Sequence, residues 1–176
     1  FLTGKKENLD INGNFKFIND DFGSENSLEE IKRFNPDICF HLAAQSSVVV
    51  SVENPALDFE HNILQPIKLI QVLLKSNCKK FVFTSSGGTI FGEPTTIPTA
   101  EEDYADEPES PYGVAKKRLN ELIKIMTKSS NLKYSILNLS NVYGPRQDPY
   151  GEAGVVSIFA KKYLNNEEPT VYGDGE

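Results

Sequence analysis

Cysteine and histidine are scarce in this sequence, which limits the chemistry open to it. Among 176 residues there are two cysteines, Cys39 and Cys78, and two histidines. No C-x-x-C spacing is present to form a redox pair or to clamp a metal, and His41 has no partner at metal-ligand spacing. We therefore expect no metal site, and two free thiols in a reducing, cytoplasmic compartment.

Long apolar runs and excess positive charge are also missing. Every apolar stretch is interrupted within about ten residues, which is too short for a helix that crosses a bilayer. The first residues show no cationic region followed by an apolar signal core. The net charge is -7, so no broad cationic surface is available to bind a phosphate backbone. We expect neither a membrane nor a nucleic acid as a partner.

Short apolar runs alternate with helical patterns along the chain. The runs are rich in β-branched and aromatic residues, and they predict strands at 37–43, 80–85 and 133–139. The helical patterns predict helices at 27–34, 55–75, 111–128 and 155–164. A capping box of Ser27 and Glu30 would open the first helix. This alternation predicts an α/β fold, a doubly wound parallel sheet with helices on both faces.

The segment 95–110 is acidic and contains several prolines. We interpret it as a surface loop whose charges are solvated, because a site for a hard cation needs converging oxygens in a turned loop. Its carboxylates are those of Glu101, Glu102, Asp103, Asp106, Glu107 and Glu109.

Tyr112 and Lys116 are four residues apart at the start of a predicted helix, so they lie on one face of it. An ammonium near a phenol favours the phenolate and lowers the pKa of tyrosine from about 10 toward neutrality. A tyrosine needs that change to accept a proton from an alcohol. Taken alone, the same spacing also fits a surface tyrosine beside a solvated lysine.

Three further motifs lie at the carboxyl ends of the predicted strands, where ligands bind in open α/β sheets. They are His41-Leu42-Ala43-Ala44-Gln45, Ser85-Ser86-Gly87-Gly88-Thr89, and Leu139-Ser140-Asn141-Val142-Tyr143-Gly144-Pro145-Arg146. With Asn62 and the Tyr112–Lys116 pair, they resemble the extended short-chain dehydrogenase/reductase family. The resemblance covers essentially the whole chain and is greatest to the UDP-glucose 4-epimerases and related nucleotide-sugar enzymes.

This resemblance implies NAD as the cofactor, held on a Rossmann-like domain. The implied cofactor contacts are, along the chain, Asp21 and Phe22 at the adenine, then Ala43, Ala44, Asn62 and Ser85, and finally Tyr112, Lys116 and Ser140. Lys116 would hydrogen-bond the nicotinamide ribose, and the Ser140 backbone would face the nicotinamide. The residue that distinguishes NAD from NADP in the family precedes Phe1.

The resemblance also implies a nucleotide-diphosphate sugar, a UDP-hexose, as the substrate. Asn141 matches the family asparagine that contacts the diphosphate, although asparagine is also common in a turn such as this one. Tyr112 would take the proton of the sugar 4-hydroxyl. The family usually places an assisting serine or threonine where this chain has Gly87, so we assign that role to Ser86.

Several alternatives for the activity stay open at this point. The leading interpretation is a 4-epimerase, because Gly87-Gly88-Thr89 offers no carboxylate of the kind that 4,6-dehydratases use to eliminate water. A dehydratase or decarboxylase of the same family is the second. A non-catalytic dinucleotide-binding relative is the third.

The family pattern also suggests how the chain is organised. Residues 1–145 would be a partial NAD-binding domain whose glycine-rich first motif precedes Phe1. Residues 146–176 would begin a smaller substrate-binding region. We therefore expect this chain to be a piece of a longer, homodimeric enzyme and to be inactive by itself.

Overall fold

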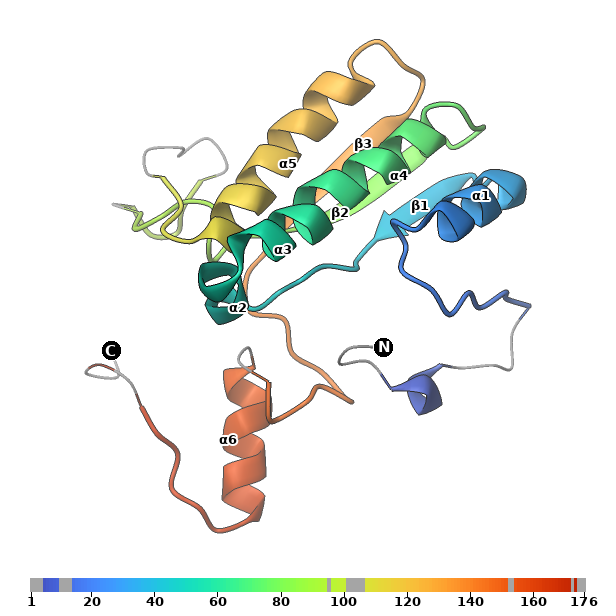
Figure 1. The fold of residues 1–176 in the computed structure, drawn as a ribbon. Helices are drawn as coiled ribbons and strands as arrows, with labels where there is room; N and C mark the ends of the chain where they lie inside the picture. Colours follow the sequence, from blue (N-terminus) through green and yellow to red (C-terminus); the bar gives the residue numbers. More distant parts are fainter. Residues whose placement is uncertain are drawn as a thin grey trace. The chain divides into compact units, whose positions relative to one another are not determined.

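A computed structural model gives the fold of this chain (Figure 1). It describes residues 5–9, 14–94, 96–100, 107–151, 154–171 and 173. The chain divides into two compact units, one within Ile11–Ser140 and the other made of Phe1–Asp10 and Asn141–Glu176. Each unit is described by itself.

The first unit contains a parallel sheet of three strands. These are β1 (Ile38–His41), β2 (Lys80–Ser86) and β3 (Lys133–Leu139), in the spatial order β1-β2-β3. Phe83 of β2 lies opposite His41 of β1 and Ile136 of β3. The predicted α/β class and all three predicted strands are confirmed. The last strand has the predicted bounds, whereas β1 is shorter at both ends and β2 is longer by one residue.

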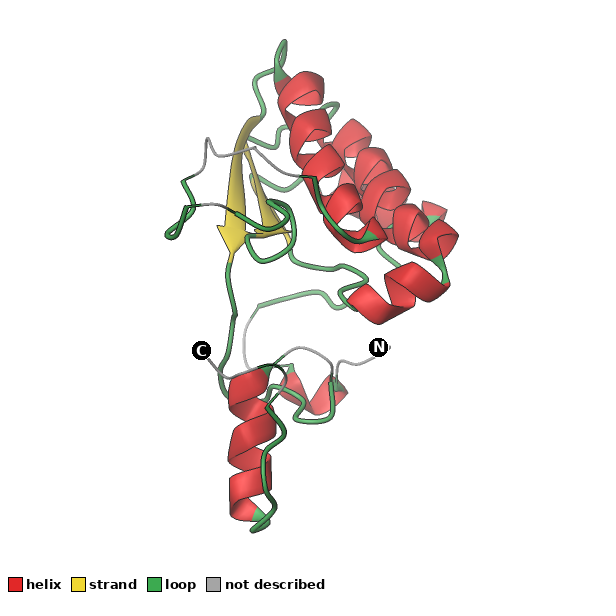
Figure 2. Ribbon diagram, turned by 90° about the vertical axis from the view of Figure 1, so that its left-hand side faces the viewer, coloured by secondary structure: helices red, strands yellow, loops and turns green. Residues whose placement is uncertain are grey.

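Three helices of this unit pack on one face of the sheet (Figure 2). They are α1 (Glu25–Phe34), α4 (Gln65–Leu73) and α5 (Pro111–Thr127). Between them and the sheet lies an apolar core, which has as its main buried members Leu69, Ile70, Leu73, Cys78, Phe81, Phe83, Leu119, Ile123 and Leu132. Burial of these side chains is the main stabilising contribution to the unit.

Among the described residues of this unit, no helix covers the second face of the sheet (Figure 2). Side chains alternate between the two faces along a strand, so Phe40 and Leu42 point to this same face. They are 65% and 63% exposed there. The sequence predicts helices on both faces, and the helices described for this unit cover one of them. The strand register explains the difference in exposure, since Phe81 and Phe83 point toward the helices and Phe40 points away from them.

The single helix predicted at 55–75 is divided into three pieces. They are α3 (Pro55–Phe59), a π-helical turn η2 (Glu60–Leu64) and α4. At the π turn the Gln65 backbone N–H donates to the Glu60 carbonyl, five residues back. Pro66 follows at once and has no N–H to donate to the Asn62 carbonyl. A π turn is one way a helix accommodates such a residue, and π turns occur often at functional sites.

A short helix that the sequence did not predict precedes these pieces. It is α2 (Val48–Glu53), with the Ser47 side chain accepting a hydrogen bond from the Val50 N–H as its N-cap. Asn54 then caps α3 by accepting from the Leu57 N–H. The run of valines here has low helix propensity, so the helix depends on its cap and on its contacts with α3 and α5.

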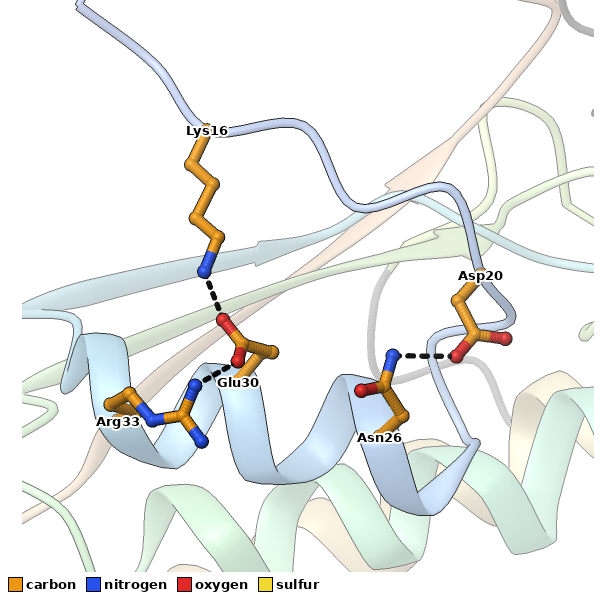
Figure 3. Close-up of polar contacts among 5 residues, drawn as sticks. All are labelled: Lys16, Asp20, Asn26, Glu30 and Arg33. Atoms are coloured by element: carbon orange, nitrogen blue, oxygen red, sulfur yellow. Dashed lines mark hydrogen bonds and ion pairs between the residues drawn. The ribbon is translucent and has the colours of Figure 1, made fainter.

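The N-cap of the first helix lies three residues before the predicted cap, and the helix begins at Glu25. Its N-cap is Ser24, whose side chain accepts from the Ser27 N–H at 3.1 Å, so the expectation for Ser27 as the cap was wrong. Glu30 does not reach back to the cap, because its carboxylate pairs with Lys16 and Arg33 (Figure 3). Figure 3 also shows Asn26 hydrogen-bonded to the Asp20 carboxylate, at 3.0 Å.

The second unit contains a short 3-10 helix η1 (Lys6–Asn8) and the helix α6 (Val155–Leu164), which has the predicted bounds. Arg146 donates a hydrogen bond from Nη1 to the Asn8 carbonyl at 3.0 Å, and so joins the two segments of this unit.

Other expectations concern segments and properties outside these elements. Residues 101–106 of the acidic segment lie outside the described residues, and Glu107 and Glu109 are exposed. No helix in the described part of the chain is long and apolar enough to cross a membrane. The same residues contain no cluster of three His, Cys, Asp or Glu side chains placed to bind a metal ion.

Candidate active site

The start of α5 fixes the position of the tyrosine–lysine pair. Ser110 is the N-cap, and its side chain accepts a hydrogen bond from the Gly113 N–H at 3.1 Å. Pro111 follows in the first helical position, where its missing N–H costs nothing. Tyr112 and Lys116 therefore lie one turn apart on the same face, and that face is buried.

Lys116 is almost fully buried at the carboxyl end of β2. Its side chain is 3% exposed, and its Nζ donates a hydrogen bond to the Thr84 carbonyl at 3.1 Å. The same Nζ lies 4.7 Å from the centre of the Phe83 ring and 5.7 Å from that of Tyr112. Burial lowers the pKa of Lys116 to about 8, and the negative charge of Asp58 opposes that change. Lys116 is thus mostly charged at neutral pH.

The pKa of Tyr112 is shifted in the opposite direction from our expectation. Burial raises it above the usual value, a hydrogen bond with the Ser86 side chain lowers it, and the charge of Asp58 raises it. The predicted lowering by Lys116 is therefore not seen in this structure. Desolvation of the phenolate is the largest cause of this rise, and the neighbouring Lys116 ammonium is directed to the Thr84 carbonyl.

The turn after β2 holds Ser86 against Tyr112. The Ser86 carbonyl accepts hydrogen bonds from the Thr89 and Ile90 N–H groups at 3.4 and 3.3 Å. The Gly87 N–H donates to the Leu139 carbonyl of β3 at 2.6 Å. A Cβ at Gly87 would lie 3.0 Å from the Asn138 carbonyl oxygen, so the close approach of the two strands favours glycine there.

The other hydroxyls considered from the sequence are placed differently. Ser85 is buried, and its Oγ has no hydrogen-bond partner among the described residues. The Thr89 Oγ1 is likewise buried without a partner in that part of the chain. The structure thus brings Ser86 together with Tyr112 and Lys116.

A buried polar network supports the loop that follows β1. Asn62 is 2% exposed and donates from Nδ2 to the Gln45 carbonyl and to Asp58 Oδ1, both at 2.9 Å. Gln45 Nε2 donates to the same Asp58 oxygen at 2.7 Å. Ala43 and Ala44, at the start of this loop, are exposed. Asn62 was predicted to support this side of the site, and these contacts are consistent with that role.

Gln45 and Asp58 were not identified as site residues from the sequence. One signal pointed to Asp58: it precedes Asn62 by four residues, so the two polar side chains share a helix face. No local signal paired Gln45 with Asp58, because thirteen residues and a loop separate them.

The predicted adenine contacts lie in the turn before α1. Phe22 packs edge-on against the His41 ring with 4.8 Å between centroids, and His41 also stacks on Phe81 and Phe83. Burial lowers the pKa of His41 to about 4, so it is a neutral, packed strand residue. Asp21 is exposed, and its Oδ1 accepts from the Gly23 N–H at 2.8 Å.

The predicted residues after β3 are less constrained. Ser140 is exposed at the end of the first unit. Asn141 is exposed and belongs to the second unit, so its predicted contact with a diphosphate stays a prediction.

The edge of the sheet at the ends of β1 and β2 fits a dinucleotide. The described contacts of Lys116 use one of its three N–H donors, which leaves donors for ribose hydroxyls. Among the described residues the buried Ser85 hydroxyl has no hydrogen-bond partner, and buried polar groups normally have one. Ala43 and Ala44 carry the smallest side chains compatible with close approach of a ligand to the backbone.

Comparison with known proteins identifies the family. The model of the NAD dependent epimerase/dehydratase family matches residues 3–176. The chain belongs to this family. The resemblance predicted from the sequence motifs is therefore confirmed, and with it the Rossmann-like class of the sheet.

Individual members of the family are similar over almost the whole chain. A putative UDP-glucose 4-epimerase of Methanocaldococcus jannaschii is 43% identical over 173 residues, which cover 98% of this chain and 56% of that protein. The crystal structure of UDP-glucose 4-epimerase with UDP-glucose from Thermotoga maritima has a TM-score of 0.91 and 44% identity, over 99% of this chain and 56% of that one. The crystal structure of the Thermus thermophilus UDP-glucose 4-epimerase in complex with NAD has a TM-score of 0.87 and 41% identity, and the match covers 97% of this chain and 54% of that one. This chain thus spans about half the length of these family members.

Replacing the buried lysine tests its electrostatic cost. We expect Lys116→Met to stabilise the protein at pH 7 by about 1–3 kcal/mol, because the wild-type protein buries a charge whose pKa falls from 10.5 to about 8. Below pH 8 Lys116 is charged in both folded and unfolded states, and the cost is fully present. The cost disappears as the pH rises from about 8 to 10.5, so the advantage of the variant shrinks over that range.

Urea unfolding at several pH values measures this effect. Lys128→Met, at an exposed lysine that follows the same helix, is the control and should change stability by less than about 0.5 kcal/mol. A Lys116→Met protein less stable than wild type at pH 7, or one whose advantage does not depend on pH, contradicts the expectation.

Gly113 allows the loop after β2 to approach α5. A Cβ at this position would lie 2.5 Å from the Thr89 carbonyl oxygen and 2.9 Å from Pro108 Cβ. We expect Gly113→Ala to destabilise the protein by about 1–3 kcal/mol, because this overlap outweighs the gain of about 1 kcal/mol in helix propensity. Thermal unfolding provides the measurement. Gly88→Ala is the control, since nothing lies within 4 Å of its Cβ; equal stability of the two variants would contradict the role of this contact.

Proposed function

We propose that the protein that carries this chain is an NAD-dependent nucleotide-sugar 4-epimerase acting on UDP-hexoses such as UDP-glucose and UDP-galactose. The observation that carries the proposal is the cluster of the buried Tyr112 and Lys116 with the partly buried Ser86 at the carboxyl end of β2. The names of similar family members, UDP-glucose 4-epimerases at 37% and 43% identity, support the same substrate class.

Each member of the cluster has a part in the reaction. Tyr112 accepts the proton of the sugar 4-hydroxyl, which leaves a 4-keto sugar after hydride loss from C4. Ser86 holds the reacting oxygen and the phenol in line through its hydroxyl. Lys116 binds the ribose and keeps a positive charge near the phenol. When bound, NAD supplies the hydride acceptor and a second positive charge, which favours the phenolate that burial disfavours.

The turn after Ser86 supports epimerisation over dehydration. Its residues Gly87, Gly88 and Thr89 carry no carboxylate, and the Gly87 N–H is bonded to β3. Return of the hydride to the opposite face of the 4-keto sugar needs no further acid or base, whereas elimination of water does.

The proposal extends to the remaining predicted contacts and to the organisation of the protein. Asp21, Phe22, Ala43, Ala44, Asn62, Ser85 and Ser140 would contact or support the cofactor, and Asn141 the sugar diphosphate. Residues 1–145 would belong to the NAD-binding domain and residues 146–176 to the substrate-binding region. The homodimeric state and the cytoplasmic location expected from the sequence stay part of this proposal.

An assay with defined nucleotide sugars tests the activity. We expect the full-length protein, incubated with UDP-glucose or UDP-galactose, to produce an equilibrium mixture of the two sugars. The N-acetylated UDP-hexoses are tested in parallel, and products are separated by chromatography. Formation of a 4-keto-6-deoxy sugar would assign the protein to the dehydratases instead, and absence of turnover with every nucleotide sugar would refute the proposal.

Substitution of the three hydroxyls around the turn tests the role of Ser86. We expect Ser86→Ala to lower kcat by about 10² to 10⁴, with a smaller effect on KM, and Tyr112→Phe to lower it at least as much. Thr89→Val is the matched control, because the Thr89 hydroxyl has no partner among the described residues and no role in the proposal. Ser85→Ala, at a predicted cofactor contact, is measured in parallel. A Ser86→Ala enzyme within a fewfold of wild type would move the role to another group.

A further inference from the structure

Asp58 is an acidic side chain in the buried network beneath the candidate active site. It lies in α3, which packs against α5, and it is fully buried. A buried carboxylate destabilises a fold unless hydrogen bonds and an opposite charge compensate for the lost hydration. An apolar residue would serve the packing of this helix equally well, so the carboxylate calls for another explanation.

One oxygen of Asp58 ties together two segments that are distant in the sequence. Oδ1 accepts hydrogen bonds from Gln45 Nε2 at 2.7 Å and from Asn62 Nδ2 at 2.9 Å. The Asn62 amide also donates to the Gln45 carbonyl, which closes a ring of contacts. Gln45 in turn bonds Ser47 in both directions, accepting from its N–H at 2.6 Å and donating to its carbonyl at 2.9 Å. The conformation of the loop after β1 is therefore set through Asp58.

The second oxygen has a different environment. Oδ2 is buried and has no hydrogen-bond partner among the described residues. The charge of Asp58 acts on both members of the tyrosine–lysine pair, since it raises the pKa of Lys116 and that of Tyr112. Two other titratable groups, His61 and His41, face this set. Burial raises the pKa of Asp58, while the hydrogen bonds from Gln45 and Asn62 and the charges of Lys116 and His61 oppose that rise. Burial and the charge of Lys116 lower the pKa of His41.

We infer that Asp58 is a positioning residue with two tasks: its Oδ1 fixes the loop at Gln45, and its buried carboxylate places a negative charge in α3, the helix that packs against α5 and its Lys116. It does not touch the reacting atoms, and it acts on them through Lys116 and through the loop. The inference rests on the proposed function only for its kinetic consequence.

The variant Asp58→Asn separates the two tasks. Asparagine keeps an oxygen that accepts from Gln45 and Asn62, but it removes the charge. We expect the pKa of Lys116, about 8 in the wild-type protein, to fall by about 1–2 pH units in this variant. The measurement is a titration of the full-length protein labelled with 13Cε-lysine, followed by NMR, with the Lys116 signal assigned by its absence in Lys116→Met. An unchanged pKa would overturn the electrostatic task.

A matched control carries the same substitution at the surface. Asp37 is an exposed aspartate that pairs with Lys79, and Asp37→Asn should leave the titration of Lys116 unchanged. In the kinetic readout, the alkaline limb of kcat/KM should move to lower pH in Asp58→Asn and stay in place in Asp37→Asn. Because the NMR titration needs no substrate, it tests Asp58 even if the sugar reaction proves to be a different one.

A second variant tests the positioning of the loop. Asp58→Ala removes both the charge and the acceptor, so we expect it to weaken NAD binding by about tenfold or more, as loss of a buried hydrogen-bond acceptor implies. Asp58→Asn should restore NAD affinity to within a fewfold of wild type. Calorimetry with the full-length wild-type protein and with each variant gives the dissociation constants for NAD. Equal NAD affinity in Asp58→Ala and the wild-type protein, or no recovery in Asp58→Asn, would overturn this task.

Discussion

Burial of the Lys116 ammonium is the constraint on which the arrangement of the first unit depends. A charged group that is 3% exposed needs compensation, and three different elements supply it. The Thr84 carbonyl at the end of β2 accepts its hydrogen bond, the Phe83 ring lies beneath it, and Asp58 of α3 contributes the opposite charge. These contacts require α5 to lie along β2 and α3 to lie against α5. The same placement puts Tyr112 beside Ser86.

The polar residues of this unit are concentrated where the apolar core ends. Phe81, Ile70, Leu119 and Ile123 fill the space between sheet and helices, whereas Asp58, Asn62 and Gln45 lie beneath the loop after β1. Such a buried network weakens a fold compared with apolar packing, and it is retained where it orients functional groups. The π turn at Glu60–Leu64 belongs to the same region, since Asn62 lies within it and Pro66 follows it. Structural irregularity and buried charge thus coincide with the candidate site.

Periodicity predicted most of the elements because it reports which face of each element is buried. The strand 133–139 and the helix 155–164 have the predicted bounds, and the helix that begins at Pro111 was found from its cap and its apolar spacing. The errors arose where non-local contacts override local preference. The valines of α2 form a helix against α3 and α5, and Glu30 pairs with Lys16, fourteen residues away, so it completes no capping box.

The sequence by itself determined that Tyr112 and Lys116 lie together, because residues four positions apart on a helix share a face. It also determined that no side-chain hydroxyl exists at Gly87. Only the tertiary structure decided that Ser86 meets Tyr112, since that depends on the hydrogen bond from Gly87 to Leu139 of another strand. It alone decided that the pKa of Tyr112 rises, because desolvation depends on every segment packed around the phenol. Asp58 became visible in the same way: a carboxylate acts on a lysine 58 positions later in the chain only because folding removes the water between them.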